Sequence, residues 1–247
     1  MRLTFAVCCV VVLFAACGAR PTGPPAGGGK KVDAATAGSV TGRIAFDGPA
    51  PAPEPLKMAS DPACAEAAGP NAMSDAVLVS NGSLENVFVF VKDGLDPAYS
   101  FDVPAQPVKF DQRGCRYVPR VFGVRAGQPI EVLNDDNTLH NVHALAKTNR
   151  EFNQSMALKG EKKTYTFAEP EAMVRFKCDV HGWMTAHVGV MPHPFFAVSK
   201  ADGTFEIPGL PPGTYTIEAW HERLGSQSQK VTIADRQPQT VSFTFKG

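Results

Sequence analysis

The sequence predicts an all-β protein, and three observations favour that class. Short runs of β-branched and aromatic residues recur along the chain, as in residues 86–91. Residues 40–46 alternate apolar and polar side chains with the period of two typical of a half-buried strand. The 22 Gly and 21 Pro are spread between such runs and favour many turns over long helices. Basic and acidic residues balance at 24 each, so charge gives no reason to expect nucleic acid as a partner.

The N-terminus has the form of a targeting segment. Arg2 precedes the apolar run 3–16, which is too short to span a bilayer comfortably as a helix. Residues 13–17 resemble the end of a bacterial lipoprotein signal, which implies removal of the segment before Cys17 and lipidation of that residue. The expected location is then the bacterial periplasm or cell envelope, with a lipid anchor in a membrane. Ordinary secretion after cleavage near Ala16 and an uncleaved anchor are the alternatives.

The rest of the chain is predicted to be a flexible linker followed by strands. Residues 18–38 are rich in Pro, Gly and Ala without apolar periodicity, which predicts a flexible linker. The stretches 49–55 and 62–68 are expected to be loop, with at most one short helical turn. The expected strands are 40–46, 76–79, 86–91, 108–110, 117–124, 128–133, 156–158, 163–167, 174–177, 187–191, 196–198, 204–207, 216–220, 231–233 and 240–245.

Candidate metal ligands follow one of these strands at regular intervals. Cys178, His181 and Met184 stand three residues apart, so one loop can wrap a thiolate, an imidazole and a thioether around one ion. His140, which follows the polar stretch 134–139, is the candidate for a second imidazole. This is the ligand set of a blue-copper centre, because soft sulfur suits Cu(I) and imidazole suits both oxidation states. Zinc is the alternative, although a thioether is a poor zinc ligand.

This pattern resembles that of the cupredoxins, with the short ligand-loop spacing of amicyanin. The Cys-x-x-His-x-x-Met sequence follows a strand, and an Asn-rich loop ends in a His-Asn pair. The resemblance implies a Greek-key sandwich with loops converging at one end. It implies that His140, Cys178 and His181 are equatorial copper ligands and that Met184 is the axial one. Asn141 would lie outside the ligands and tie the two ligand loops together.

The six cysteines favour an oxidising compartment. Two of them lie in the segment expected to be removed, Cys17 is the expected lipidation site, and Cys178 is the expected ligand. Cys64 and Cys115 remain, and two otherwise unused thiols outside the cytoplasm are expected to form a disulfide. The alternative is two separate buried thiols, because the sequence gives no distance between them.

The tail, residues 195–247, has a second signature. Its Gly-Leu-Pro-Pro-Gly-Thr-Tyr stretch leads into a strand, and the tail resembles the second half of the carboxypeptidase-regulatory-like β-sandwich. Residues 39–96 resemble the first half of such modules. About fifty residues rarely bury enough apolar surface to hold a sandwich together, so we expect the cupredoxin-like segment 104–193 to be inserted between the two halves. The alternative is a cupredoxin over 39–193 followed by a small separate sheet.

The expected function is one-electron transfer by a copper lipoprotein, with the ion cycling between Cu(II) and Cu(I). The resemblance implies that His181 reaches the surface as the electron port, and that a redox protein such as a c-type cytochrome is the partner. The sequence shows no acid–base pair, so an enzyme is not expected. The competing expectation is a non-redox copper-binding or envelope-interaction protein whose β-sandwich binds a protein or a glycan. His193 and His221 are expected to be surface or interdomain residues without a metal.

Overall fold

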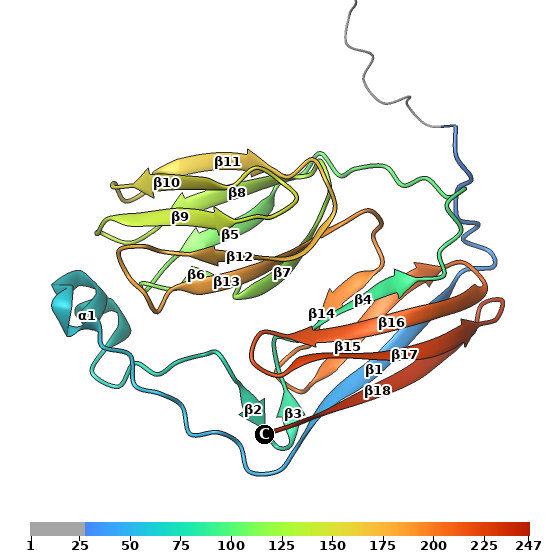
Figure 1. Cartoon of the computed structure of the whole chain (residues 1–247), viewed down its shortest axis with the longest axis horizontal. Coiled ribbons are helices and arrows are strands. Elements are labelled where there is room, and N and C mark those ends of the chain that lie inside the picture. Colours follow the sequence, from blue (N-terminus) through green and yellow to red (C-terminus); the bar gives the residue numbers. More distant parts are fainter. Residues whose placement is uncertain (1–27) are drawn as a thin grey trace, which may run out of the picture.

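The computed structural model describes residues 28–247, which form two β-sandwiches and one short α-helix (Figure 1). The expected signal segment, the lipidation site Cys17 and the first part of the linker lie outside the described residues. The predicted all-β class is confirmed, because every layer of the structure is a β-sheet. In the part of the chain that the structure describes, no helix is long and apolar enough to cross a membrane.

One sandwich is assembled from two segments that lie far apart in the sequence, and we call it the split sandwich. Its first sheet has the strand order β15-β1-β3-β2, with β18 also paired to β1, and its second has the order β14-β4-β16-β17. The strands are β1 (Gly38–Asp47), β2 (Val79–Ser80), β3 (Ser83–Leu84), β4 (Phe88–Asp93), β14 (Phe196–Val198), β15 (Thr204–Leu210), β16 (Gly213–His221), β17 (Gly225–Ile233) and β18 (Pro238–Lys246). Strand β1 therefore lies between two strands of the tail.

The core of the split sandwich follows from the alternation in its strands. Val40 and Ile44 of β1 are fully buried, and they share one hydrophobic cluster with Phe243 and Phe245 of β18. Strand β1 pairs in parallel with β18 and antiparallel with β15. Because the strands on both sides of β1 come from the tail, neither chain segment closes this core by itself.

The other sandwich occupies the chain between β4 and β14, and we call it the inserted sandwich. Its sheets have the orders β10-β9-β12-β13-β7 and β11-β8-β5-β6. The strands are β5 (Val108–Gln112), β6 (Tyr117–Val118), β7 (Val121–Arg125), β8 (Pro129–Asn134), β9 (His140–Leu145), β10 (Phe152–Met156), β11 (Lys162–Thr166), β12 (Glu171–Lys177) and β13 (Thr185–Met191). The rings of Phe110, Phe122 and Phe176 meet in its core.

Two expected strands of the inserted sandwich differ from the structure. The run 117–124 is not one strand, because it divides at Pro119 into β6, which pairs with β5, and β7, which pairs with β13 in the other sheet. Proline has no amide hydrogen to continue a ladder, which suits a crossing between sheets. The strand expected over 156–158 is β10, which ends at Met156 and pairs with β9.

The connection between β1 and β2, residues 48–78, leaves the split sandwich and reaches the inserted one (Figure 1). We call it the bridging segment. Where the sequence predicted mostly loop, it holds the 3-10 helix η1 (Met58–Ser60) and the helix α1 (Pro62–Ala68). Asp61 caps α1 through its carboxylate, and a proline in the first turn suits a helix start. Met58 and Cys64 are buried in the core cluster of the inserted sandwich.

The two sandwiches touch closely along β7 and β13. A Cβ at Gly123 would lie 2.2 Å from the ring of Phe196, and one at Gly189 would lie 2.4 Å from the ring of Phe88. Aromatic rings of the split sandwich therefore pack directly against glycines of the inserted sandwich. Arg120 adds a largely buried ion pair with Glu222 across the same contact.

His193 and His221 are not surface residues, which corrects that part of their expected placement. His193 is 7% exposed and its Nε2 lies 2.9 Å from the carbonyl oxygen of Val91 in β4. His221 is 1% exposed, at the end of β16. Both are therefore structural residues of the split sandwich and its junction.

Candidate metal centre

Three of the expected ligands gather at one end of the inserted sandwich. His140 is the first residue of β9, and Cys178 directly follows β12. These strands are antiparallel neighbours, so the start of one lies beside the end of the other. The ligand atoms of His140, Cys178 and His181 all lie within 4.8 Å of one another, and all three residues are buried. Residues that are 41 positions apart in the sequence thus form one cluster.

The two imidazoles face each other through the same ring atom. The Nδ1 atoms of His140 and His181 are 3.0 Å apart, and the Cys178 Sγ lies 3.9 Å from the Nδ1 of His181. Each Nε2 meets a carboxylate, Asp136 at 2.9 Å and Asp61 at 3.0 Å. A carboxylate accepts a hydrogen bond, so each Nε2 carries a proton, and the Nδ1 of a neutral ring directs its lone pair at the centre. Two such lone pairs and a sulfur converge, and this donor set fits a copper ion.

The electrostatics of the cluster also favour a bound cation. Burial lowers the pKa of His140, but its hydrogen bonds to Asp136 and Cys178 outweigh that effect and raise the pKa to about 9. A bound cation would take the place of the Nδ1 proton, because a metal ion needs the neutral imidazole. Burial raises the pKa of the Cys178 thiol, while the hydrogen bond from His140 and backbone amides lower it more, so the pKa falls below its usual value. The surroundings therefore stabilise the thiolate, which is the form that binds metal.

The loop after Cys178 closes on itself. The amide of His181 lies 3.4 Å from the Cys178 Sγ, and the amide of Met184 donates to the carbonyl oxygen of His181 at 2.9 Å. The amide of Cys178 in turn donates to the carbonyl oxygen of Met184 at 3.2 Å. Met184 is 1% exposed and belongs to the core cluster of the inserted sandwich. The backbone thus holds the fourth expected ligand next to the other two on this loop.

Asn141 links the two ligand loops. Its Oδ1 accepts a hydrogen bond from the amide of Asp179 at 2.7 Å and lies 3.2 Å from the Cys178 Sγ. His143, two residues further along β9, contacts Asp179 and Glu151 instead of the cluster. Asn141 therefore ties β9 to the Cys178 loop from outside the ligand set.

The Asp136 carboxylate, which contacts the His140 ring, is itself held by backbone amides. Gly114 and Cys115 both adopt left-handed φ angles, 62° and 53°, and their consecutive amides donate to the two oxygens of Asp136 at 2.7 and 2.8 Å. Successive amides that converge in this way form a cradle for an anion. The position of the His140 ring thus depends on the loop that carries Cys115.

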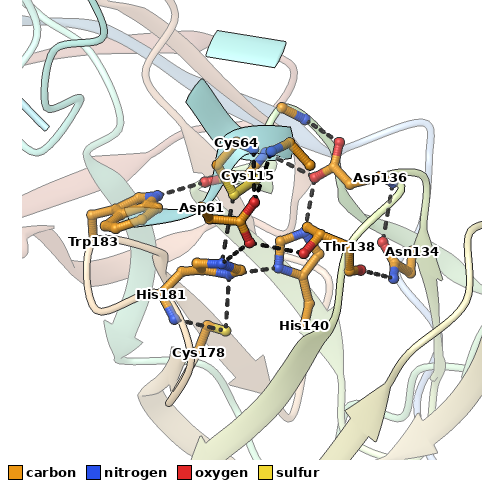
Figure 2. The surroundings of a disulfide bond; sticks show 12 residues. Asp61, Cys64, Cys115, Asn134, Asp136, Thr138, His140, Cys178, His181 and Trp183 are labelled. Atoms are coloured by element: carbon orange, nitrogen blue, oxygen red, sulfur yellow. Dashed lines mark hydrogen bonds and ion pairs between the residues drawn. A yellow bond between two sulfur atoms is a disulfide. The ribbon is translucent and has the colours of Figure 1, made fainter. Parts of the chain in front are cut away.

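Cys64 and Cys115 are joined by a disulfide with a Cα–Cα distance of 5.4 Å. Figure 2 shows this bond beside both imidazoles, with the Cys64 Sγ 3.6 Å from the Nε2 of His181. The bond connects the bridging segment to the inserted sandwich. Cys178 is the unpaired cysteine of the described residues.

His181 does not reach the surface, and the expectation that its ring is an exposed electron port is wrong. It is 2% exposed. Asp61 and Cys64 of the bridging segment lie against its Nε2, and the Trp183 ring lies 5.1 Å from its own ring. The Trp183 Nε1 donates to the carbonyl oxygen of Cys115 at 2.9 Å, which holds the indole in place.

Sequence reasoning missed the residues that surround the ligands: Asp61, Asp136, Thr138 and Trp183. Asp136 and Thr138 lie in the polar stretch before His140, and Trp183 lies within the ligand loop, so proximity in sequence could have drawn attention to them. Asp61 is 120 residues from His181 and carried only the local signal of a helix cap before a proline.

A family comparison covers the end of the chain. Residues 186–246 match the family described as Carboxypeptidase regulatory-like domain, which is less than half of the chain. The match begins within β13 of the inserted sandwich and runs through the strands of the tail. None of the curated proteins matches the chain.

Solved structures of copper proteins are similar to part of the chain. A purple cupredoxin from Nitrosopumilus maritimus is 19% identical, with a TM-score of 0.30, over 34% of this chain and 99% of that one. A methionine-to-alanine mutant of amicyanin in the Cu(I) form is 19% identical, with a TM-score of 0.32, over 42% and 98%. The Cu-containing nitrite reductase from Thermus scotoductus is 23% identical, with a TM-score of 0.33, over 39% of this chain and only 27% of that one.

Proposed function

We propose that this chain binds one copper ion and transfers single electrons. The observation that carries the proposal is the convergence of the Nδ1 atoms of His140 and His181 with the Cys178 sulfur in a buried cluster. Met184, held in the same closed loop, would supply a thioether as the fourth ligand. This N₂S set with a thioether beside it suits copper better than zinc or harder ions.

Bound copper would supply a one-electron couple between Cu(II) and Cu(I). The chain's own part is to hold the ligands still. His140 begins β9 and Cys178 directly follows β12, which pairs with β9, and Asp136 and Asp61 fix the imidazole rings from outside. Because these partners orient the rings before any ion binds, the ligand geometry changes little between two charge states.

The proposal extends to location and partner. The Cys64–Cys115 bond supports an oxidising compartment such as the bacterial periplasm or cell envelope. Lipidation of Cys17 would attach the chain to a membrane, and the linker after it would let the sandwiches meet a redox protein such as a c-type cytochrome. Secretion without an anchor is the alternative.

One observation favours a second candidate function, a non-redox copper-binding protein. The burial of His181 removes the exposed imidazole edge through which electron exchange was expected. A copper ion enclosed in this way exchanges electrons slowly unless another part of the site gives electrons a route to the surface. In that case the split sandwich would carry the biological role by binding a protein or a glycan. Stopped-flow reduction of the copper form by a small reagent and by a c-type cytochrome separates the two functions.

The first test is a visible spectrum of the protein loaded with Cu(II) under oxidising conditions. We expect an intense band, because a thiolate bonded to Cu(II) gives a strong charge-transfer absorption, and we expect Cys178→Ser to abolish it. Met184→Gln is the matched variant in the same loop. It should keep the band while the reduction potential falls, because an oxygen ligand favours Cu(II) more than a thioether does. The proposal is wrong if the wild-type protein has no such band or if Cys178→Ser keeps it.

A further inference from the structure

The bridging segment covers the candidate metal centre although its chain belongs to the split sandwich. It leaves β1, lays α1 over the ligand loops and returns to β2 (Figure 1). Met58 and Cys64 are 3% and 0% exposed, in the hydrophobic core cluster that also contains Cys178 and Met184. Two backbone hydrogen bonds join its two arms, from the Leu56 amide to the Ala72 carbonyl oxygen at 2.9 Å and from the Ser74 amide to the Glu54 carbonyl oxygen at 2.8 Å. The segment is thus built into the centre and is more than a surface loop.

Asp61 connects this segment to both ligand loops. Its Oδ1 accepts the amides of Ala63 and Cys64 at 2.9 and 3.1 Å, which caps α1. Its Oδ2 accepts the Thr138 hydroxyl at 2.8 Å and faces the His181 Nε2 at 3.0 Å (Figure 2). One oxygen therefore orders the helix, while the other lies between the two segments that carry the histidines.

The two imidazoles are held in matching ways by carboxylates of different origin. His140 is held by Asp136, which belongs to the inserted sandwich, and His181 is held by Asp61, which comes from the bridging segment. The Cys64–Cys115 bond joins these supports, because Cys64 lies in the helix that Asp61 caps and Cys115 donates an amide to Asp136. The inserted sandwich thus supplies only one of the two supports itself.

We infer that Asp61 is a positioning residue for the metal centre, contributed by the split sandwich, which holds His181 with its Nδ1 toward the other ligands and keeps the ring covered. The inference rests on the proposed copper site. A carboxylate behind a ligand imidazole makes the imidazole a stronger donor, and its negative charge stabilises Cu(II) more than Cu(I). Asp61 therefore lowers the reduction potential as well as fixing the ring. A redox protein that docks where the bridging segment covers His181 would contact α1 and not the His181 ring.

Cap-retaining substitutions separate this role from helix stability. Asn and Ser are good N-cap residues, so Asp61→Asn and Asp61→Ser should keep α1 while removing the charge. The serine side chain is also too short to reach His181. Glu66→Gln is the matched control, because it removes one negative charge from an exposed position on the same helix.

In the copper-loaded protein both Asp61 variants should weaken Cu(II) binding by about 10- to 100-fold, as loss of a supporting partner typically does. Cu(I) binding should weaken less, and each tenfold difference between the two states raises the potential by about 59 mV. Glu66→Gln should leave the affinity and the potential close to wild type. Equal potentials in wild type and in both Asp61 variants would overturn the inference.

A measurement on the metal-free protein distinguishes failure of this inference from failure of the copper assignment. We expect the Nε2 proton of His181 to be protected from exchange and visible by NMR in the wild type and in Glu66→Gln, and to be lost in Asp61→Ser. If the proton stays protected in Asp61→Ser, Asp61 does not hold the ring. A wild-type protein without a visible copper band would contradict the proposed function, while the exchange result would still decide whether Asp61 positions His181.

Discussion

The two sandwiches differ in how they are assembled and in what they carry. The inserted sandwich is one continuous stretch of chain, and it contributes His140, Cys178, His181 and Met184. The split sandwich needs two separated segments, because β1 pairs with β15 and β18 and β4 pairs with β14 and β16. It contributes no ligand of that set, yet its bridging segment covers the site.

The candidate ligands and the residues that cover them thus come from different parts of the chain. The candidate ligands are local to one sandwich, whereas the cover over His181 comes from the bridging segment of the other. The Arg120–Glu222 ion pair and the aromatic rings seated on Gly123 and Gly189 fix the two bodies to each other. A change that loosens this contact should therefore affect the candidate metal centre through the bridging segment.

Separating the two sandwiches should have the most severe consequence for folding. A fragment of residues 195–247 should not fold, because its strands β15 and β18 lose β1, the strand that lies between them. A fragment of residues 104–193 keeps both of its own sheets and should fold. Circular dichroism with urea titration measures both. A cooperative unfolding transition in the tail fragment would favour two consecutive domains instead.

The next effect concerns the disulfide between the bridging segment and the inserted sandwich. Replacing both Cys64 and Cys115 by Ser should lower the free energy of unfolding by about 4 kcal/mol, as the chain-entropy relation gives for a loop of this length. The two residues are 51 positions apart. Urea unfolding of the full chain measures the change against the disulfide-bonded wild type, and the reduced wild type should resemble the variant. A loss below about 1 kcal/mol would show that the segment stays in place by packing alone.

The smallest effect is a pH dependence at the contact between the sandwiches. Burial lowers the pKa of His187 to about 4, and its ring lies 5.0 Å from that of Trp220 in the split sandwich. Above pH 6.5 neither the folded nor the unfolded form is protonated at this residue. Between about pH 6.5 and 4 the unfolded chain takes up the proton first, so stability falls with falling pH by up to about 3 kcal/mol.

The variant His187→Phe tests this pH dependence. The His187 Nδ1 has no hydrogen-bond partner among residues 28–247, so a phenyl ring loses no hydrogen bond to them there. Urea midpoints of the variant at pH 7 and pH 5 should differ less than those of wild type. Some dependence should remain, because burial lowers the pKa of His221 to about 4 as well. Equal pH dependence in both proteins would contradict the assignment to His187.

Local patterns in the sequence were sufficient for much of the fold. Alternation in residues 40–46 and 240–245 predicted strands that the structure contains, as β1 and β18, and the all-β class followed from such runs. The spacing of Cys178, His181 and Met184 predicted one ligand loop, and the structure closes that loop by backbone hydrogen bonds. These features depend on residues a few positions apart, which the sequence displays directly.

Other features depend on contacts between distant residues. A helix of seven residues is too short to be stable alone, so the formation of α1 rests on its packing against the inserted sandwich. The prediction that His181 is exposed was wrong for the same reason, since Asp61, which covers its ring, lies more than a hundred positions away in the sequence. The division of residues 117–124 at Pro119 likewise depends on which sheet each half joins.

Short-range periodicity and spacing were enough to predict the all-β class, the order of most strands and the residues with ligand chemistry. The contact of Asp61 with His181, the place of β1 between β15 and β18, and the burial of the His181 ring became known from the folded chain alone. These contacts depend on the path of the chain between the sandwiches. A path of that kind is selected by the packing of whole surfaces and leaves no periodic signal in the residues that follow it.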